Sequence, residues 1–424
     1  MLGSLANAWK IPELRQKLLF TAMILALYRL GAYIPLPGIS PQTLSGAGPG
    51  GNNSLTSLFS AFTGGAFSNY AIFSLGIMPY ITAAIVMQLM TVAIPRLQEL
   101  SKEGEAGQQK ITQYTRYFTL ALAVIQSIAI VFYFRADGAL AGASILQLVV
   151  VVFTLTAGVM LTMWMGELIS QRGLGNGISL IITASILSQA PQAVRALIEN
   201  GSILVIVVLA LLAVMIIAAI VFVNEGQRRI PITYAKRQVG RRMSQGGTTY
   251  LPLKVNMAGV IPIIFASSLL LFPVILAEFA GGGDPDSLLT RIAGFFDPSS
   301  APYLILYALL IIMFTYFYTA VQFNPVEHAD NLKKSGGYVP GIRPGQQTAL
   351  YLNNVLTRIT LFGAAFLALV AVIPYIISPL LGLGSTILLG GTSMLIVVGV
   401  SLDTVRQLES QLMMRNYEGF LKKR

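Results

Sequence analysis

The sequence predicts an all-α integral membrane protein, and three observations support this fold class. Of its 424 residues, 55% are hydrophobic and only 11% are charged, whereas a soluble domain carries about 25% charged residues. Apolar runs of about 20 residues, the length of a spanning helix, recur along the whole chain. Lys and Arg outnumber Asp and Glu by 28 to 17, and most of the basic residues lie in alternate loops, as in membrane proteins that follow the positive-inside rule.

The apolar stretches predict ten transmembrane helices. They cover residues 18–34, 70–92, 117–134, 146–166, 177–197, 202–223, 257–278, 302–322, 355–378 and 385–403. In this topology both termini lie on one side of the membrane, together with every loop that leads from an even-numbered to an odd-numbered span. That side then holds 24 of the 28 Lys and Arg residues, counting Arg358 at the start of the ninth span. This bias predicts that both termini are cytoplasmic. We expect no cleavable signal peptide, because charged, amphipathic sequence precedes the first span.

The ten spans divide into an N-terminal half, residues 1–200, and a C-terminal half, residues 201–424. With five spans in each half, similar halves would be inverted relative to each other, as in many transport proteins. The two halves show no convincing sequence similarity, so the two inverted five-helix halves are a hypothesis at this stage.

The composition excludes several function classes. The chain has no cysteine and one histidine, His328, which excludes disulfides, thiol catalysis and a His-rich metal site. Ionisable residues are nearly absent from the spans, and Arg29 is close enough to the outer end of the first span to snorkel. The loops lack the glycine-rich motif that cradles nucleotide phosphates. We therefore expect no enzyme, cofactor or metal, and favour a passive or externally driven conduit over a solute transporter.

The segment 50–69, between the first two spans, is too short to span the membrane and too apolar for a solvated loop. Its core, Ser54–Phe62, is predicted to be a short helix with Asn53 or Ser54 as N-cap and Gly64-Gly65 as terminator. The segment is either an interfacial helix on the outer surface or a re-entrant element that fills a cavity. Composition alone does not separate these two interpretations.

Isoleucines lie one helical turn apart in two spans, at Ile77 and Ile81 and at Ile178 and Ile182. Residues four apart share a helix face. Lipid contact or core packing is the ordinary explanation, and a hydrophobic constriction formed by several helices is the alternative.

Two long loops, 224–256 and 323–354, are placed in the cytoplasm. The first carries six basic residues within 15 positions, from Arg228 to Arg242, and would attract ribosomal RNA, anionic lipid or an acidic protein face. In the second, Gly-Gly and Pro-Gly steps after Asn331 predict a structured set of turns rather than a helix. Arg343 lies on one of these turns.

Long strings in the chain resemble the SecY family, the channel subunits of the bacterial Sec protein translocon. The matching strings include GIMPYITAAIVMQL at 76–89, GNGISLII at 175–182, YAKRQVGRRM at 234–243, LPLKVNMAGVIPIIFASSLLLFP at 251–273, NPVEHADNLKKSGGYVPGIRPGQQT at 324–348 and GGTSMLIVVGVSLDT at 390–404. They occur in the order in which the family has them, from residue 11 to the tail at 417–423.

The resemblance implies a protein-conducting channel for secretion of unfolded preproteins and lateral insertion of membrane proteins, and it assigns residues to parts of that channel. The plug would be re-entrant and contain Asn53, Ser54, Leu55, Leu58, Phe59, Phe62, Gly64 and Gly65. The pore ring would be Ile77, Ile81, Ile178, Ile182, Ile264 and Ile396. The lateral gate would lie between spans 2–3 and spans 7–8, with Gln88 and Asn256 as polar gate positions; a capping or interhelical hydrogen bond is the other role considered for these two.

The resemblance also implies partners. SecE and SecG would be the other subunits, and the motor ATPase SecA or the ribosome would drive translocation. Docking would use Arg237, Arg241, Arg242, Arg343 and the C-terminal tail. A translocating preprotein or signal peptide and membrane lipid complete the expected contacts, and the expected location is the plasma membrane. A secondary transporter of a small solute, built on inverted repeats, is the alternative.

Overall fold

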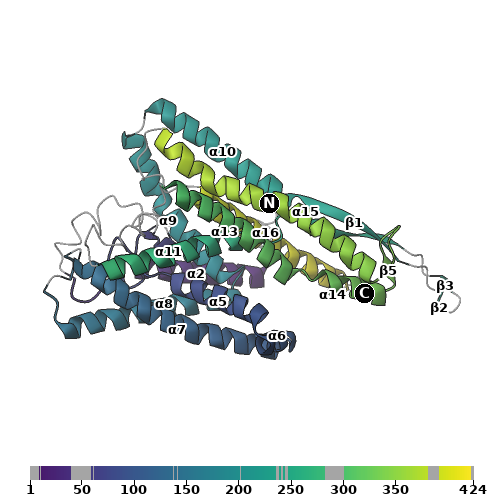
Figure 1. The fold of residues 1–424 in the computed structure, drawn as a ribbon, viewed down its shortest axis with the longest axis horizontal. Helices are drawn as coiled ribbons and strands as arrows, with labels where there is room; N and C mark the ends of the chain where they lie inside the picture. The colour runs from purple at the N-terminus through teal and green to yellow at the C-terminus, as the bar shows by residue number, and fades with distance from the viewer. Residues whose placement is uncertain are drawn as a thin grey trace.

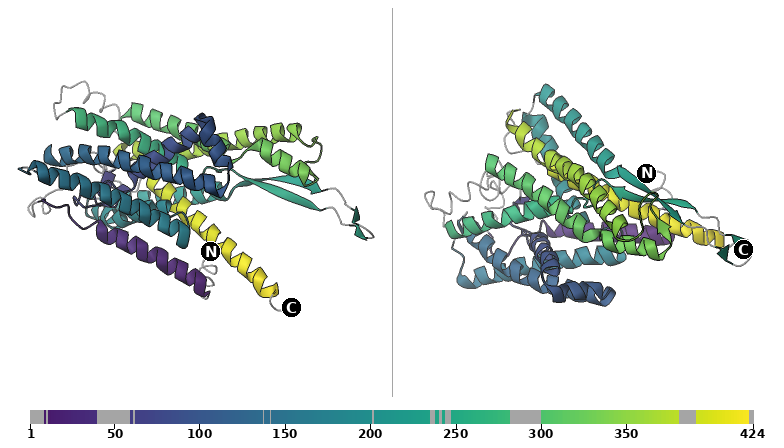
Figure 2. Two further views of the ribbon diagram at one scale, coloured as in Figure 1. Left: turned by 90° about the horizontal axis from the view of Figure 1, so that it is seen from below. Right: turned by 45° about the vertical axis from the view of Figure 1, so that its right-hand side comes forward.

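The computed structural model describes most of the chain. The described residues are 9, 11–39, 59–60, 62–136, 138–140, 142–200, 202–234, 238–239, 242–243, 247–281, 300–380 and 391–421. Long helices run along the major axis of the molecule, and a β-hairpin projects beyond them at one end (Figure 1). The start of the first long helix and the end of the last one both point toward the end that carries the hairpin (Figure 2).

A helix overlaps each of the ten predicted spans. These helices are α2 (Pro12–Gly31), α5 (Met78–Ala93), α7 (Glu105–Ala136), α8 (Ile145–Arg172), α9 (Gly177–Asn200), α10 (Ile203–Glu225), α11 (Ile261–Gly281), α13 (Ala301–Gln322), α15 (Gln346–Leu380) and α16 (Gly391–Leu421). Two shorter helices, α6 (Pro95–Lys102) and α14 (Pro325–Lys334), lie outside the predicted spans. The order of the elements therefore agrees with the predicted helical membrane fold.

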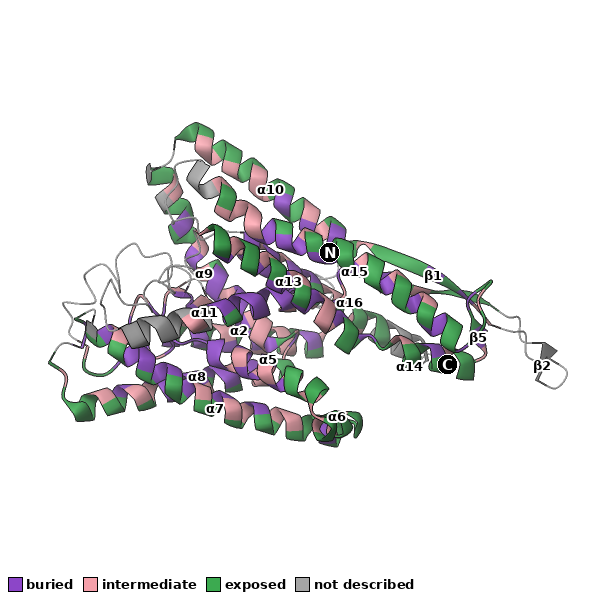
Figure 3. Cartoon of the chain, in the orientation of Figure 1, coloured by how far each residue is buried: buried purple, intermediate pink, exposed green. Residues whose placement is uncertain are grey.

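Six helices in the described part of the chain are long and apolar enough to cross a membrane, and a seventh span results if α5 and α6 are counted as one bent pair. The bend between these two helices is 99° and lies at Ile94, whose backbone is extended, directly before Pro95 opens α6. α10 has the highest mean hydropathy, 3.5, and only 11% of its apolar window is buried. Its surface is largely exposed in Figure 3, as expected for a helix that faces lipid. The chain is a multi-pass membrane protein.

Side-chain caps fix where several helices begin. Ser144 accepts a hydrogen bond from the backbone of Gln147, whose side chain accepts one from the Ser144 backbone, so α8 starts with a complete capping box. Ser202 and Ser300 cap α10 and α13 in the same position. The Ser202 cap separates α9 from α10 at the boundary predicted between the two halves. The division into halves, and their inverted relation, remain predictions.

The second span begins later than predicted. Residues 64–77 form turns and a short bridge, and α5 begins only at Met78, because Gly64, Gly65, Tyr70 and Gly76 all have positive φ values. A left-handed residue cannot continue an α-helix. The backbone of Leu36 and Ile34 pairs with that of Tyr70 and Ile72, so this irregular segment is hydrogen-bonded to the chain that follows α2.

The loop after α10 forms strands, a feature that the predicted all-helical fold lacked. β1 (Gln227–Tyr234) and β4 (Thr248–Lys254) pair as an antiparallel hairpin, and β5 (Gly337–Tyr338) adds to the other edge of β1. The short strands β2 (Gln238–Val239) and β3 (Arg242–Met243) pair farther along the loop. Ile230 and Leu253 of the hairpin are buried in a small core with Phe323, Val339, Leu352 and Leu356. Burial of these apolar side chains stabilises the hairpin, while its other face is exposed, as is common for antiparallel sheets.

The loop after α13 was predicted to consist of turns, and this prediction is wrong for its first part. α14 continues to Lys334 because Asn324 caps its first turn and Pro325 occupies the first helical position. The turns begin at Gly336, and Gly336, Gly341 and Gly345 have positive φ values. Only this second part of the loop matches the prediction.

A single hydrophobic core joins the helices of both halves. It includes residues from α2, α5, α7, α8, α9, α10, α11, α13, α15 and α16. α11 packs against α5 and α7, and α16 packs against α9 and α10. The N-terminal helices are further joined by a bidentate ion pair in which Arg116 of α7 donates to both oxygens of Glu167 of α8, at 2.9 and 2.7 Å. Arg406 of α16 donates to Glu225 at the end of α10, at 2.8 Å.

Close packing of α8 against the irregular segment gives a test of this fold. A side chain at Gly158 would collide with the carbonyl oxygen of Ile72. We expect Gly158→Val to lower the free energy of unfolding by about 1–3 kcal/mol, the usual cost of overpacking, measured as a lower melting temperature in detergent. Ala157→Val, at an exposed position on the same helix, is the control. Equal melting temperatures for the two variants would contradict this packing.

Candidate functional site

The six isoleucines of the predicted pore ring come from different parts of the sequence and meet in the same hydrophobic core. Ile77 precedes α5, Ile81 lies in α5, Ile178 and Ile182 lie on α9, Ile264 lies on α11 and Ile396 lies on α16. Five of them are at most 5% exposed, and Ile178 is half-buried against the same core. The structure thus brings isoleucines of both halves into one apolar region. Because this core also contains many other side chains, a ring around a conduit remains a prediction.

The described part of the predicted plug begins at Phe59; Asn53, Ser54, Leu55 and Leu58 lie outside the described residues. Residues 59–60 and 62–63 are helical, and Gly64 and Gly65 follow with φ values of 66° and 86°. The Gly65 amide donates to the Ser60 carbonyl at 2.9 Å. The predicted glycine terminator is confirmed, since glycine adopts this left-handed conformation without a steric penalty.

Aromatic side chains pack the chain that follows the predicted plug helix against neighbouring helices. The ring of Phe67 packs against Phe59 with a centroid distance of 5.3 Å and against Phe134 of α7 at 5.4 Å. The ring of Tyr70 meets that of Phe134 edge to face at 4.9 Å. Phe73 stacks on Tyr28 of α2 at 5.5 Å. The segment 59–76 therefore packs against α2 and α7 as part of the protein core rather than lying on an outer surface.

Polar contacts to this segment were not predicted from the sequence. Arg29, which was expected to snorkel, donates through Nη1 to the carbonyl of Gly64 at 2.6 Å. Tyr28, Ser185, Ser188 and Gln189 also bond to residues 60–64 or to one another. A lone arginine near the end of an apolar span was the available sequence signal, because a charge in a membrane helix requires a partner.

The helices of the predicted lateral gate are in contact. α11 packs against α5 and α7, and the Ser268 hydroxyl of α11 lies 3.7 Å from the sulfur of Met78 of α5. Gln88 is half-buried on α5, and its side chain makes no hydrogen bond with other described residues. The structure thus places span 7 against spans 2 and 3 as the resemblance implies.

Asn256 lies at a joint between helices. Its side-chain amide donates to Asn224 of α10 at 2.9 Å and to the carbonyl of Gly259 at 3.1 Å, just before α11 begins. Its Oδ1 is buried without a hydrogen-bond partner. These contacts favour the interhelical hydrogen-bonding role for Asn256, whereas a role in the gate remains a prediction.

The predicted docking residue Arg343 lies at the end that carries the hairpin, beside β5, which pairs with β1. Arg343 is exposed on the turns before α15, and its carbonyl accepts a hydrogen bond from Thr348 Oγ1 at 2.9 Å. The neighbouring Ile342 packs against the small core beneath the hairpin. Arg242 opens β3, while Arg237 and Arg241 lie outside the described residues. The turn therefore presents Arg343 to solvent on a fixed backbone.

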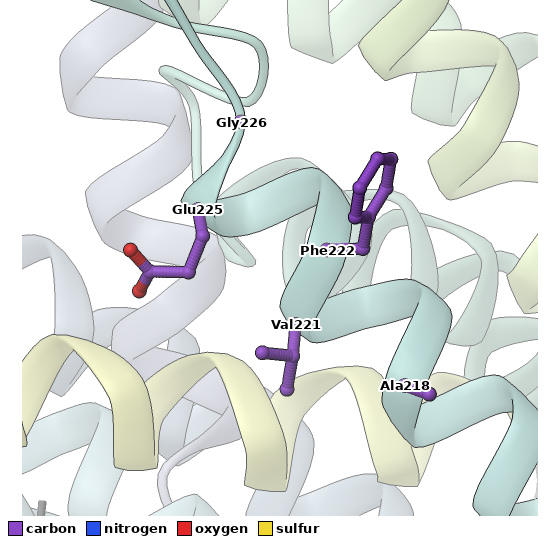
Figure 4. A pocket seen from close by; sticks show the side chains of 5 residues that line it. All are labelled: Ala218, Val221, Phe222, Glu225 and Gly226. Carbon is purple, nitrogen blue, oxygen red and sulfur yellow. The ribbon is translucent and has the colours of Figure 1, made fainter.

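One shallow pocket lies at the end of α10 (Figure 4). Its volume is about 640 Å³, and it is lined by Ala218, Val221, Phe222, Glu225 and Gly226. Glu225 is its charged residue and is already paired with Arg406. A solute site needs several converging polar groups, which this pocket does not provide. Among the described residues, no group of three or more His, Asp or Glu side chains is placed to hold a metal ion.

Comparison with known proteins gives consistent results. A family model described as SecY matches residues 71–405. The chain is 48% identical over 442 residues to the protein translocase subunit SecY of Mycobacterium tuberculosis strain H37Rv, with 100% of each chain covered. It is 46% identical over 440 residues to the protein translocase subunit SecY of Streptomyces coelicolor, again over 100% of both.

Solved structures share the fold. A structure of SecY whose plug domain stabilises the closed state of the translocation channel has a TM-score of 0.65 at 17% identity, over 93% of this chain and 91% of that one. Sec61 in a canine ribosome–channel complex from the endoplasmic reticulum has a TM-score of 0.60 at 18% identity, with the same coverage. The family model and the full-length relatives confirm the resemblance found in the sequence strings, and the chain belongs to the SecY family.

Proposed function

We propose that this chain is the protein-conducting channel of a Sec translocase, which passes unfolded preproteins across the membrane and releases membrane proteins sideways into lipid. The observation that carries the proposal is the convergence of isoleucines from α5, α9, α11 and α16 in one apolar core, which also contains Phe59, Phe67 and Phe73. Membership of the SecY family supports it. No chemical step is required, so the chain acts as a channel and not as an enzyme.

The six isoleucines form the constriction in this proposal. Branched apolar side chains close around a moving polypeptide of any sequence, and a ring without polar groups disfavours water and ions when the chain is absent. The plug, residues 50–69, seals the resting channel. Buried apolar contacts of Phe59 and Phe67 support this closed arrangement.

The lateral gate opens where α11 meets α5 and α7 in this proposal. α11 packs against α5 and α7, and buried isoleucines of α5 and α11 lie in the same core, with Ser268 and Met78 as a weak polar pair. An apolar signal sequence can replace such contacts at little cost, because lipid and protein side chains are similarly apolar. Gln88 and Asn256 are proposed to be the polar gate positions.

The driving force comes from partners, since the sequence has no nucleotide-binding motif. SecA or the ribosome docks on the cytoplasmic end through Arg237, Arg241, Arg242, Arg343 and the tail, and SecE and SecG complete the complex. The exposed position of Arg343 on a fixed turn supports this assignment. Both termini and the basic hairpin face the cytoplasm, and the membrane is the bacterial plasma membrane. The two five-helix halves are inverted repeats.

Photocrosslinking from the proposed ring tests the conduit. A photoreactive residue at Ile81 or Ile396 is expected to crosslink to a stalled secretory precursor in membranes that contain SecA and SecE, because the ring surrounds the translocating chain. Ile169 of α8 and Ile220 of α10 are equally buried, at 0% exposure, and serve as controls that give only background crosslinking.

Crosslinks of equal yield from ring and control positions, or from the controls alone, would assign Ile81 and Ile396 to ordinary packing. If the precursor crosslinked to no position of the chain, the solute-transporter alternative would regain support.

Charge reversal at Arg343 tests docking. Arg343→Glu is expected to reduce SecA-driven secretion by about tenfold or more, because reversing a charge in a polar interface typically costs several kcal/mol. The melting temperature should stay nearly unchanged, since the side chain is exposed. Lys110→Glu, an exposed reversal on α7, is the control. Normal export by the Arg343 variant would refute this role.

A further inference from the structure

Polar side chains from two helices converge on one short stretch of backbone at the end of the plug helix. The stretch is Ser60–Gly64, and the side chains are those of Arg29 on α2 and of Ser188 and Gln189 on α9. We call these three residues the plug latch. None of them belongs to the predicted pore ring or gate.

Arg29 is the charged member of the plug latch, and its orientation is fixed by three contacts. Nη1 donates to the Gly64 carbonyl at 2.6 Å, Nη2 donates to the Tyr33 hydroxyl at 2.9 Å, and the guanidinium lies 5.1 Å from the centre of the Tyr33 ring. No carboxylate among the described residues lies within ion-pair distance of it. The main partner of the positively charged guanidinium is therefore the backbone carbonyl of Gly64, at the end of the plug helix.

Ser188 and Gln189 hold the same backbone from α9. The Ser188 hydroxyl donates to the Ser185 carbonyl at 2.6 Å or, when it is turned the other way, to the Gly64 carbonyl at 3.4 Å, which is the weaker of the two contacts. The Gln189 side-chain amide donates to the Ser60 carbonyl and, at 2.9 Å, to the Ser60 hydroxyl. Ser60 also accepts a hydrogen bond from Ser68 at 2.9 Å, which ties the end of the helix to the chain beyond the glycines.

Tyr28 and Ser185 form a buried hydrogen bond next to the plug latch. The Tyr28 hydroxyl is 2.8 Å from Ser185 Oγ and 3.4 Å from the carbonyl of Thr63. Tyr28 and Thr63 are both 0% exposed. The Tyr28–Ser185 hydrogen bond therefore joins α2 to α9 directly beside Arg29 and one helical turn before Gln189.

The contacted carbonyls lie at the C-terminal end of the plug helix, where the helix dipole is negative. The Ser60 carbonyl accepts the Gly65 amide at 2.9 Å, and the Gln189 amide is a second donor to it. The carbonyl of Gly64, the first left-handed residue after the helix, accepts a hydrogen bond from Arg29, which places a positive charge at this end. Any movement that carries Ser60–Gly64 away from α2 and α9 must break these hydrogen bonds.

We propose that the plug latch is a set of positioning residues that fixes how readily the plug leaves its closed seat, and thereby how strong a signal sequence must be to open the channel. The proposal rests on the proposed channel function. The apolar contacts of Phe59 and Phe67 stabilise the closed position of the plug. The hydrogen bonds of the plug latch stabilise this position further, and they are lost when the chain moves at Gly64. A weaker plug latch raises the open fraction without altering the conduit.

Thiol accessibility measures the position of the plug directly. The chain contains no cysteine, so Thr63→Cys introduces a single thiol at a site that is buried in the closed state. In this background, Arg29→Gln and Gln189→Leu are each expected to raise the rate of labelling by a water-soluble maleimide roughly tenfold. A hydrogen bond from a charged or buried donor typically changes an equilibrium constant by about this factor.

Matched controls are available on α9. Arg195→Gln and Gln192→Leu make the same changes at exposed positions of that helix and should leave the labelling rate unchanged. Ser188→Ala removes one donor with little change in volume; it keeps the test available if the larger substitutions prevent folding, and a roughly twofold or greater rise is expected. Arg29→Lys keeps the charge and should restore slow labelling in part.

Export gives a second readout. The plug-latch variants should export a precursor with a weakened signal sequence better than the unaltered chain does, with normal export of an intact precursor. Labelling rates and export equal to those of the controls in folded plug-latch variants would overturn the proposal. Failure of the unaltered chain to export an intact precursor would instead contradict the channel function, while the labelling rates would still report on the contacts of the plug.

Discussion

The architecture depends on the requirement that backbone N–H and C=O groups be hydrogen-bonded wherever water is absent. Helices meet this requirement internally, which explains why each apolar stretch of the chain becomes one. The segment 62–77 leaves the helical pattern at four positive-φ residues, Gly64, Gly65, Tyr70 and Gly76. It is tolerated because Arg29 and Ser188 contact its Gly64 carbonyl, because its backbone pairs with that of Ile34 and Leu36, and because the aromatic rings of Phe67, Tyr70 and Phe73 are buried against α2 and α7.

Polar interactions are few, and they lie at the places where helices must be fixed relative to one another. Arg116 and Glu167 join α7 to α8, and Arg406 joins α16 to the end of α10 through Glu225. Further hydrogen bonds join helices within the core, including those of Ser127 with Thr156 and of Tyr307 with Thr392. At the proposed gate, the described residues of α11 and α5 are joined by the weak contact of Ser268 with Met78. Opening there would break few strong hydrogen bonds, which matters because a buried polar atom that loses its partner carries a high desolvation cost.

Sequence patterns predicted much of this arrangement for identifiable reasons. The helices were found because hydropathy over about 20 residues determines whether a segment can span. The glycine terminator of the plug was found because Gly64 and Gly65 suit a left-handed helix end. The end of α14, after Asn331, was predicted to form turns. That prediction relied on the Gly and Pro residues that follow α14, which form turns only beyond the end of the helix. The β1–β4 hairpin was also missed, since its pairing depends on a register set by residues about 20 positions apart.

By itself, the sequence determined the helical membrane fold, the order of the helices, the absence of cysteine chemistry and the family, because these properties follow from composition, local periodicity and long matching strings. Only the tertiary structure decided the contacts of Arg29 and Asn256. In the sequence Arg29 was a charge near a span end; in the structure it is a donor to Gly64, 35 residues away. Such assignments depend on which helices become neighbours, and that is fixed by packing of the whole core rather than by any local segment of the chain.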